Sequence, residues 1–202
     1  NFTNDLIKSI RDNDKVVKYV DIPLQHINNN ILKRMNRRTT KESIVSLISQ
    51  LREEIPDIII RTTFIVGFPG ETDVEFNELV EFVKEMKFDR LGVFAYSREE
   101  GTPAYNLPNQ VSDKIKESRR EKIMEIQREI SEKIMAKHIG KVLTVLIEDK
   151  VDENTYVARS YMDSPEIDGL VYVNSNSDLE LGSFIDVKVT NSLEYDLVGE
   201  VI

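Results

Sequence analysis

The sequence predicts an α/β domain followed by a small antiparallel β-barrel. In residues 1–139, β-branched apolar runs alternate with stretches whose apolar residues recur at helical spacing. That alternation is typical of a parallel sheet with crossover helices. After Gly140, short strand-like segments are separated by clusters of Asp, Asn, Ser and Gly, as in small barrels. We therefore expect two domains, 1–139 and 140–202, with a long connecting helix over 112–139.

Three strands are expected in the α/β domain. Residues 19–24 form the first, which Pro23 is expected to end. The second, 58–66, is β-branched and nearly continuous, which is typical of a parallel strand covered on both faces. Residues 91–96 form the third and lead into a polar loop. The order β-α-β-α-β then places all three in one parallel sheet.

The two crossover helices carry start signals. Residues 44–55 place apolar side chains on one helical face. Thr39 and Glu42 have the spacing of a capping box before this helix. Thr72 and Glu75 form a second capping box before the next helix.

Four short strands are expected in the barrel, with room for a fifth. They lie at 142–147, 156–161, 169–173 and 184–189.

Composition excludes several classes of site. The 202 residues include no cysteine, so this chain supplies no disulfide, no thiolate nucleophile and no Cys ligand for zinc or an iron–sulfur cluster. No run of apolar residues is long enough to span a membrane. We expect no metal site in the chain, no membrane partner and a cytoplasmic location.

The net charge of −9 is unevenly distributed. Residues 1–139 contain 23 basic and 23 acidic side chains, whereas residues 140–202 contain 4 basic and 13 acidic ones. An acidic module repels nucleic-acid phosphates and attracts basic surfaces. The alternative, that the acidity only aids solubility, stays open.

Ligands of parallel α/β folds bind beyond the carboxyl ends of the strands. Three polar or glycine-containing segments fall there, at 25–26, 67–71 and 96–102. For the second, the alternative is a tight turn that only feeds a helix. For His26 we expect a structural hydrogen bond, because no other histidine or suitable cluster lies near it in the sequence.

A basic cluster follows the first strand. Residues 22–41 contain no acid and five basic side chains, a set that suits a carboxylate or phosphate or simply forms a solvated helix end. No Ser-His-Asp arrangement, P-loop or dinucleotide motif is present. The alternative that the chain is a conventional small-molecule enzyme on an α/β sheet is therefore not supported by any set of catalytic residues.

Three motifs resemble those of the radical S-adenosylmethionine (SAM) methylthiotransferases. They read DIPLQH with ILKRMNR in residues 21–37, RTTFIVGFPGET in 61–72 and FAYSREEGTPA in 94–104. Their order and spacing match the family over essentially the whole chain. The C-terminal barrel is similar to the TRAM domain of these proteins. The resemblance implies the C-terminal half of a radical SAM partial barrel, with three parallel strands and helices, plus TRAM.

The TRAM segment indicates a branch of the family. Residues 158–169, ARSYMDSPEIDG, are similar to the branch that methylthiolates the β-carbon of an aspartate on small-subunit ribosomal protein number twelve. The resemblance gives Asp163, Glu166 and Asp168 a role in recognising this basic protein. The acidity disfavours tRNA as a partner. The alternatives are a tRNA adenosine methylthiotransferase and a non-enzymatic TRAM-type binding module.

The family also implies cofactors. These enzymes use SAM and two [4Fe–4S] clusters, and the clusters and SAM carry the difficult radical chemistry. Because their cysteine ligands are absent here, the resemblance implies a C-terminal part of a longer enzyme that is inactive alone. No catalytic residue is assigned within the chain, and the electron donor is not identified.

The resemblance implies which residues contact SAM. Gln25 would contact the ribose or amino-acid portion, and Arg34 and Arg37 would assist a carboxylate of SAM or of the substrate. Many members have serine at the position of Asn28, so a hydroxyl-specific role there is in doubt. The remaining expected SAM contacts are Arg61, Thr63, Ile65, Val66, Gly67, Phe68, Phe94, Ala95 and Tyr96.

Overall fold

A computed structural model describes residues 2–202. The chain forms two compact units, one ending at Gln127 and the other spanning Arg128–Ile202. The boundary between the units falls within helix α5 (Asp113–Ala136), so the expected domain boundary at residue 139 stays a prediction.

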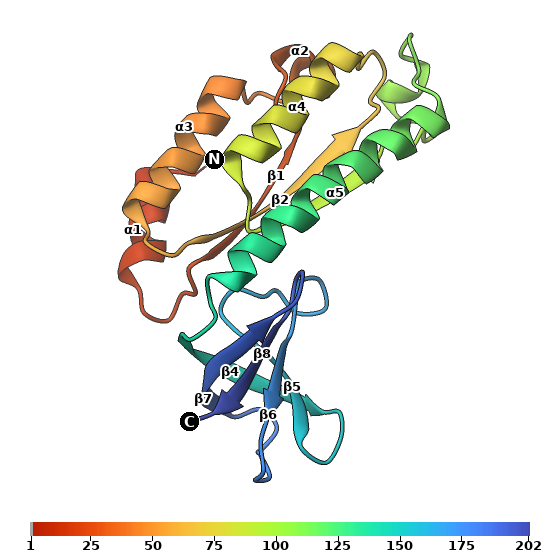
Figure 1. The fold of residues 1–202 in the computed structure, drawn as a ribbon. Helices are drawn as coiled ribbons and strands as arrows, with labels where there is room; N and C mark the ends of the chain where they lie inside the picture. Colours follow the sequence, from red (N-terminus) through yellow and green to blue (C-terminus); the bar gives the residue numbers. More distant parts are fainter. Residues whose placement is uncertain (1) are drawn as a thin grey trace. The chain divides into compact units, whose positions relative to one another are not determined.

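The first unit contains a three-stranded parallel sheet in the order β1-β2-β3 (Figure 1). The strands are β1 (Tyr19–Gln25), β2 (Ile59–Val66) and β3 (Arg90–Ala95). The expected parallel sheet is confirmed, and each strand agrees with its predicted range within one residue. The sheet is accompanied by the helices α1 (Asn4–Asp12), α2 (Asn29–Arg34), α3 (Lys41–Glu54), α4 (Asp73–Met86), the 3₁₀ helix η1 (Pro103–Asn106) and α5.

The core lies on one face of the sheet. Along β2, Thr62, Phe64 and Val66 are buried, whereas the alternate residues from Arg61 to Ile65 are only half-buried. Phe64 packs edge-on against Phe82 and Phe88 of the α4 region, with ring centroids 6.2 and 5.8 Å apart. The prediction that both faces of this strand are covered is therefore wrong. The half-buried face is left for the site described below.

Pro23 does not end the first strand. The strand continues to Gln25, and its pairing with β2 is irregular between Ile22 and Gln25. Because β1 is an edge strand of the sheet, a residue without an N–H is tolerated at this irregularity. The strand thus extends far enough to place Gln25 at the carboxyl edge.

The helix starts depend on side-chain caps. At α4 the predicted box is confirmed: the Thr72 N–H donates to Glu75 Oε2 (2.9 Å), and the Thr72 hydroxyl accepts from Val74 N–H (3.2 Å). At α3 the box is one residue later than predicted. It consists of Thr40 and Ser43. The Ser43 hydroxyl accepts from the Thr40 N–H (2.9 Å), which is the role that we assigned to Glu42.

The second unit contains a closed barrel in the order β4-β5-β6-β8-β7. Four strand pairs are antiparallel, but β6 and β8 are parallel, which the prediction of a purely antiparallel barrel did not include. Sequence patterning missed β8, whose Gly199 is required because a Cβ there would lie 2.4 Å from Val187 Cγ1. The strands are β4 (Val142–Lys150), β5 (Thr155–Arg159), β6 (Val171–Asn174), β7 (Phe184–Ser192) and β8 (Leu197–Val201).

Among residues 2–202, no helix has both the length and the apolar character needed to cross a membrane.

Replacing the α4 cap tests this account of the helix start. Thr72→Ala is expected to lower the free energy of unfolding by about 1 kcal/mol, because it leaves the first-turn N–H groups without their acceptor. Thr72→Ser keeps the hydroxyl and serves as the matched control. Urea denaturation followed by circular dichroism measures both, and equal stability of the two variants would contradict the capping role.

The same substitution has a pH signature. The hydrogen bond from Thr72 is the main reason why the pKa of Glu75 lies below its ordinary value. A lowered carboxyl pKa stabilises the fold at neutral pH, and this contribution is lost as pH falls through the folded-state pKa. Thr72→Ala should therefore lose less stability on acidification than the native chain.

Candidate functional site

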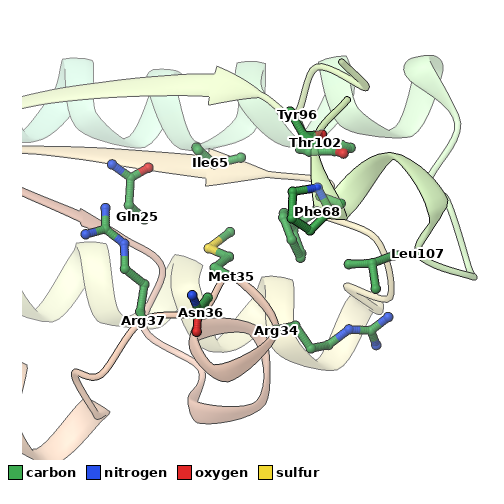
Figure 2. Close-up of a pocket in the computed structure, with 12 residues that line it drawn as sticks. Gln25, Arg34, Met35, Asn36, Arg37, Ile65, Phe68, Tyr96, Thr102 and Leu107 are labelled. Carbon is green, nitrogen blue, oxygen red and sulfur yellow. The ribbon is translucent and has the colours of Figure 1, made fainter. Parts of the chain in front are cut away.

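A cavity of about 490 Å³ lies at the carboxyl ends of the strands, within the first unit (Figure 2). Its wall combines apolar side chains with a few polar ones, as in many sites for small molecules. The lining residues are Gln25, Arg34, Met35, Asn36, Arg37, Ile65, Phe68, Tyr96, Thr102, Pro103, Ala104 and Leu107.

Two buried polar atoms of this wall lack a partner among the described residues. They are Oε1 of Gln25 and the hydroxyl of Tyr96. The Tyr96 ring packs edge-on against Phe68, with centroids 5.1 Å apart, which fixes the position of its hydroxyl. Buried polar groups in proteins are nearly always hydrogen-bonded, so each of these two lining residues has hydrogen-bonding capacity that no described residue uses.

The two arginines of the wall differ in orientation. In Figure 2 the Arg37 side chain extends toward Gln25, whereas Arg34 points away from it. Arg37 Nη2 donates to the Pro23 carbonyl (3.4 Å). Arg34 lies on the turn after β2: Gly70 has φ +84°, and a Cβ there would be 1.9 Å from Arg34 Nη1. Arg37 is therefore the better placed of the two to bind an anionic group in the cavity.

The structure brings together six of the predicted site residues, namely Gln25, Arg34, Arg37, Ile65, Phe68 and Tyr96. The other residues expected to contact SAM do not line the cavity. Val66 is fully buried on the opposite face of β2, and Phe94 is 61% exposed. Arg61 forms an ion pair with Asp21 (2.6 Å). The remaining expected contacts outside the lining are Thr63, Gly67 and Ala95.

Thr102, Pro103, Ala104 and Leu107 line the cavity, and of these only Thr102 lies in a segment that we expected there. They surround η1, whose start at Pro103 agrees with the preference of proline for the first turn of a helix. The side-chain amide of Gln110 holds this segment by donating to the carbonyls of Ala104 and Leu107 (3.2 and 3.0 Å). The sequence signal that could have identified this segment is Gly101-Thr102-Pro103, which is part of the third motif.

Asn28 has two structural contacts. Its Oδ1 accepts from the N–H groups of Asn30 and Ile31 (2.9 and 3.2 Å), which caps α2. Its Nδ2 donates to Glu78 Oε2 (2.7 Å). Burial opposes ionisation of Glu78, but hydrogen bonds from Lys41 and Asn28 outweigh it and keep the Glu78 pKa below its ordinary value. Thus Asn28 fixes the start of the helix that carries Arg34.

A buried ionic cluster is formed by residues that do not line the cavity. The Glu71 side chain is fully buried, and its Oε1 accepts from the Gly67 N–H (3.0 Å) and from Arg119 Nη1 (2.8 Å). Its Oε2 lies 3.3 Å from Nε2 of the fully buried His26. Glu71 is therefore a specific neighbour of His26, for which we expected a structural role. This cluster joins α5 to the segments that follow β1 and β2.

The three acids predicted to recognise a substrate lie in the second unit and differ in their surroundings. Asp163 is 7% exposed, and its Oδ2 accepts from the Ser160 hydroxyl (2.8 Å). Asp168 is half-buried and accepts from the Ser164 N–H (2.9 Å). Glu166 is exposed, with φ 62°. Glu166 is therefore the most exposed of the three.

Comparisons with known proteins agree with the two-part fold. The family model described as the radical SAM superfamily matches residues 1–83, and the TRAM domain model matches residues 139–202. A solved structure of coproporphyrinogen III oxidase (HemN) from Escherichia coli, a radical SAM enzyme, superimposes with a TM-score of 0.53. It covers 64% of this chain and 30% of its own length at 20% identity, so it shows the fold alone.

Curated relatives match nearly the whole chain. The ribosomal protein uS12 methylthiotransferase RimO of Clostridioides difficile is 52% identical over 99% of this chain and 45% of its own length. The protein of the same name from Caldanaerobacter subterraneus is 54% identical over 98% of this chain and 45% of its own length. The chain thus spans about half the length of these relatives.

The ionic cluster makes a testable contribution to stability. Arg119→Met removes a cation from a buried carboxylate, so we expect a loss of about 3–5 kcal/mol in the free energy of unfolding. The control is Arg120→Met, which removes a half-exposed arginine paired with Glu117 on the same helix and should change stability by no more than about 0.5 kcal/mol. Urea titration followed by the helical circular dichroism signal measures both. Similar losses in the two variants would contradict the importance of the cluster.

Proposed function

We propose that this chain, which belongs to the radical SAM methylthiotransferase family, is part of an enzyme that methylthiolates the β-carbon of an aspartate on ribosomal protein uS12, the small-subunit protein number twelve. The observation that carries this proposal is the 52% identity to relatives named for that reaction over nearly the whole chain. The cavity gives it a physical basis. The proposed reaction takes place where ribosomes are, in the cytoplasm.

The cavity fits SAM by the chemistry of its wall. Ile65 and Phe68 offer apolar surface to an adenine ring. The side chain of Gln25 offers a polar amide to a ribose hydroxyl or to the ammonium group of the amino-acid portion. Arg37 offers a guanidinium to a carboxylate. When bound, SAM and a reduced iron–sulfur cluster supply the radical chemistry, while these residues bind and orient.

The cluster ligands have to come from outside this chain, because the sequence contains no cysteine. We propose two [4Fe–4S] clusters in the whole enzyme, as the resemblance implies, with no metal ligand and no catalytic residue contributed by these 202 residues. Accordingly the chain alone is expected to be inactive. The electron donor is not assigned.

The second unit is proposed to recognise the protein substrate. Residues 140–202 contain 13 acidic and 4 basic side chains, which suits a basic ribosomal protein and disfavours tRNA. Glu166 is the most accessible of the three predicted acids. The hydrogen bonds of Asp163 and Asp168 to the backbone of the same loop hold it in place. Those two acids thus act by shaping the loop.

Deleting the gene that encodes this chain tests the reaction. We expect mass spectrometry to show uS12 without its methylthio group and bulk tRNA with its methylthio marks intact. Expression of the 202-residue chain in the deletion strain should not restore the mark on uS12. Loss of a tRNA mark with an intact uS12 mark would instead support the tRNA-modifying alternative and overturn our proposal.

Charge reversal in the second unit tests the proposed partner. Glu166→Lys should weaken binding of purified uS12 several-fold at low ionic strength, and the difference should fade at high salt because exposed charges are screened. Glu153→Lys, an equal change at another exposed acid of this unit, is the control. Calorimetry at two salt concentrations measures both. Equal weakening would mean that net charge, rather than the loop, attracts the partner.

A further inference from the structure

Apolar side chains adjoin one another on the outer face of the barrel, where β4, β7 and β8 are neighbours (Figure 1). Along β7, Val187 and Val189 are buried, whereas Phe184, at the start of the strand, is 71% exposed. Phe184 lies opposite the half-buried Leu146 of β4. Residues directly opposite each other point to the same face, with Cβ atoms about 5 Å apart. The phenyl ring and this leucine are therefore neighbours on the surface.

A third apolar residue adjoins this pair from the other side of β7. Val201 of β8 lies opposite Val187, and the next N–H, of Ile202, donates to the Asp186 carbonyl (3.4 Å). The pairing thus places Ile202 beside Asp186 and diagonal to Phe184, within reach of a long or aromatic side chain. Ile202 is 69% exposed. Leu146, Phe184 and Ile202 together are called the β7 patch below.

The β7 patch has an acid in its midst. Asp186 shares the outer face of β7 with Phe184, and its Oδ1 accepts from the Thr144 hydroxyl of β4 (2.6 Å). This hydrogen bond orients the carboxylate on the face without neutralising its charge. An exposed apolar patch with polar groups at its border is the usual anatomy of a protein interaction site.

Each of the two cations near the β7 patch faces an acid on a neighbouring strand. Arg159 of β5 lies opposite Leu146, and its Nε donates to Glu148 (2.5 Å). Lys188 of β7 lies opposite Glu200 of β8. The charge of Asp186 is therefore in excess on this face, and the whole segment 140–202 contains 13 acids against 4 bases. A partner with basic side chains complements this surface.

The barrel limits how a partner can bind. Because the barrel is closed, it offers no free strand edge, and a partner cannot extend the sheet. Binding therefore has to use side chains on a face. An exposed aromatic ring can also stack on a nucleic-acid base, but surfaces of that kind combine the ring with a cationic groove. The acidity of this unit favours a basic protein instead.

We propose that the β7 patch is a docking surface for the basic protein substrate, which places an apolar side chain on Phe184 and a basic one beside Asp186. The cross-strand row from Phe184 through Leu146 ends at Arg159, the last residue of β5. The loop that displays Glu166 follows directly, so the patch extends the surface already proposed for recognition. The inference rests on the proposed function only in naming the partner as uS12.

The experiment compares Phe184→Ser, Asp186→Asn and Val151→Ser in the 202-residue chain. Asparagine at position 186 removes the charge but keeps an oxygen that accepts from Thr144. Val151 is an exposed valine of the same unit, in the turn after β4 and outside the β7 patch, so it is the matched apolar control. Calorimetry with purified uS12 at low and high salt measures affinity, and thermal unfolding checks that each variant is folded.

For Phe184→Ser we expect affinity at least about tenfold weaker at both salt concentrations, because salt does not screen an apolar contact and truncating a central aromatic anchor is costly. Asp186→Asn should weaken binding several-fold at low salt, and the difference should fade at high salt. Val151→Ser should bind like the native chain. All three melting temperatures should stay close to the native value, because the three side chains are exposed.

Cross-linking provides a second measurement that leaves Phe184 intact. Because the chain contains no cysteine, Lys188→Cys supplies a single attachment point for a benzophenone maleimide on the face of the β7 patch. Illumination should cross-link this variant to uS12. Lys84→Cys, at a half-exposed lysine of α4, is the control and should give no such product.

The outcomes separate this inference from the proposed function. If uS12 binds but Phe184→Ser weakens binding no more than Val151→Ser, the docking surface is overturned and the proposed partner stands. If the native chain does not bind uS12 at low salt, the docking surface and the proposed partner both fail, while the methylthio mark on uS12 still decides the reaction. The docking surface is also overturned if Phe184→Ser abolishes a dimer of the native chain or the binding of single-stranded RNA, because the patch would then serve a second copy or a nucleic acid.

Discussion

A carboxylate withdrawn completely from water has to be paired and hydrogen-bonded, because an uncompensated buried charge costs several kcal/mol. Glu71 meets this requirement with partners from three places in the chain, namely the turn at Gly67, the helix that carries Arg119 and the end of β1 at His26. The segments that follow β1 and β2 cannot separate without exposing that charge. Gln25 and Phe68, which line the cavity, are the chain neighbours of His26 and Gly67.

The ionic cluster and the cavity wall both contain buried polar atoms. In the cluster, Glu71 Oε1 has two donors and Arg119 has two acids, Glu71 and Asp73. In the cavity wall, Gln25 Oε1 and the Tyr96 hydroxyl are buried without a partner among the described residues. Glu71 Oε2 and His26 Nε2 lie 3.3 Å apart and are also buried without a hydrogen-bond partner among the described residues, so unused hydrogen-bonding capacity is a property of both places.

Local patterns of the sequence account for most of the fold. The β-branched run at 58–66, the Thr72 capping box and the turn signals after Gly140 each predicted an element that the structure contains. The periodicity of apolar residues alone did not predict two features of the strands. Pro23 stays within a strand because the strand is at the sheet edge, and β8 needs Gly199 to approach β7. Both depend on neighbours that are distant in the sequence.

Site residues were harder to predict, because a motif gives positions along a strand but not the face on which each side chain lies. Ile65 and Val66 are adjacent in one motif, yet only Ile65 lines the cavity. The same limit applies to the acids of the second unit. Asp163 and Glu166 count equally in the net charge, but Asp163 binds Ser160 inside its loop and Glu166 is exposed. Counting acids therefore overstates the charge that meets a partner, and the loop that displays Glu166 is the more specific feature.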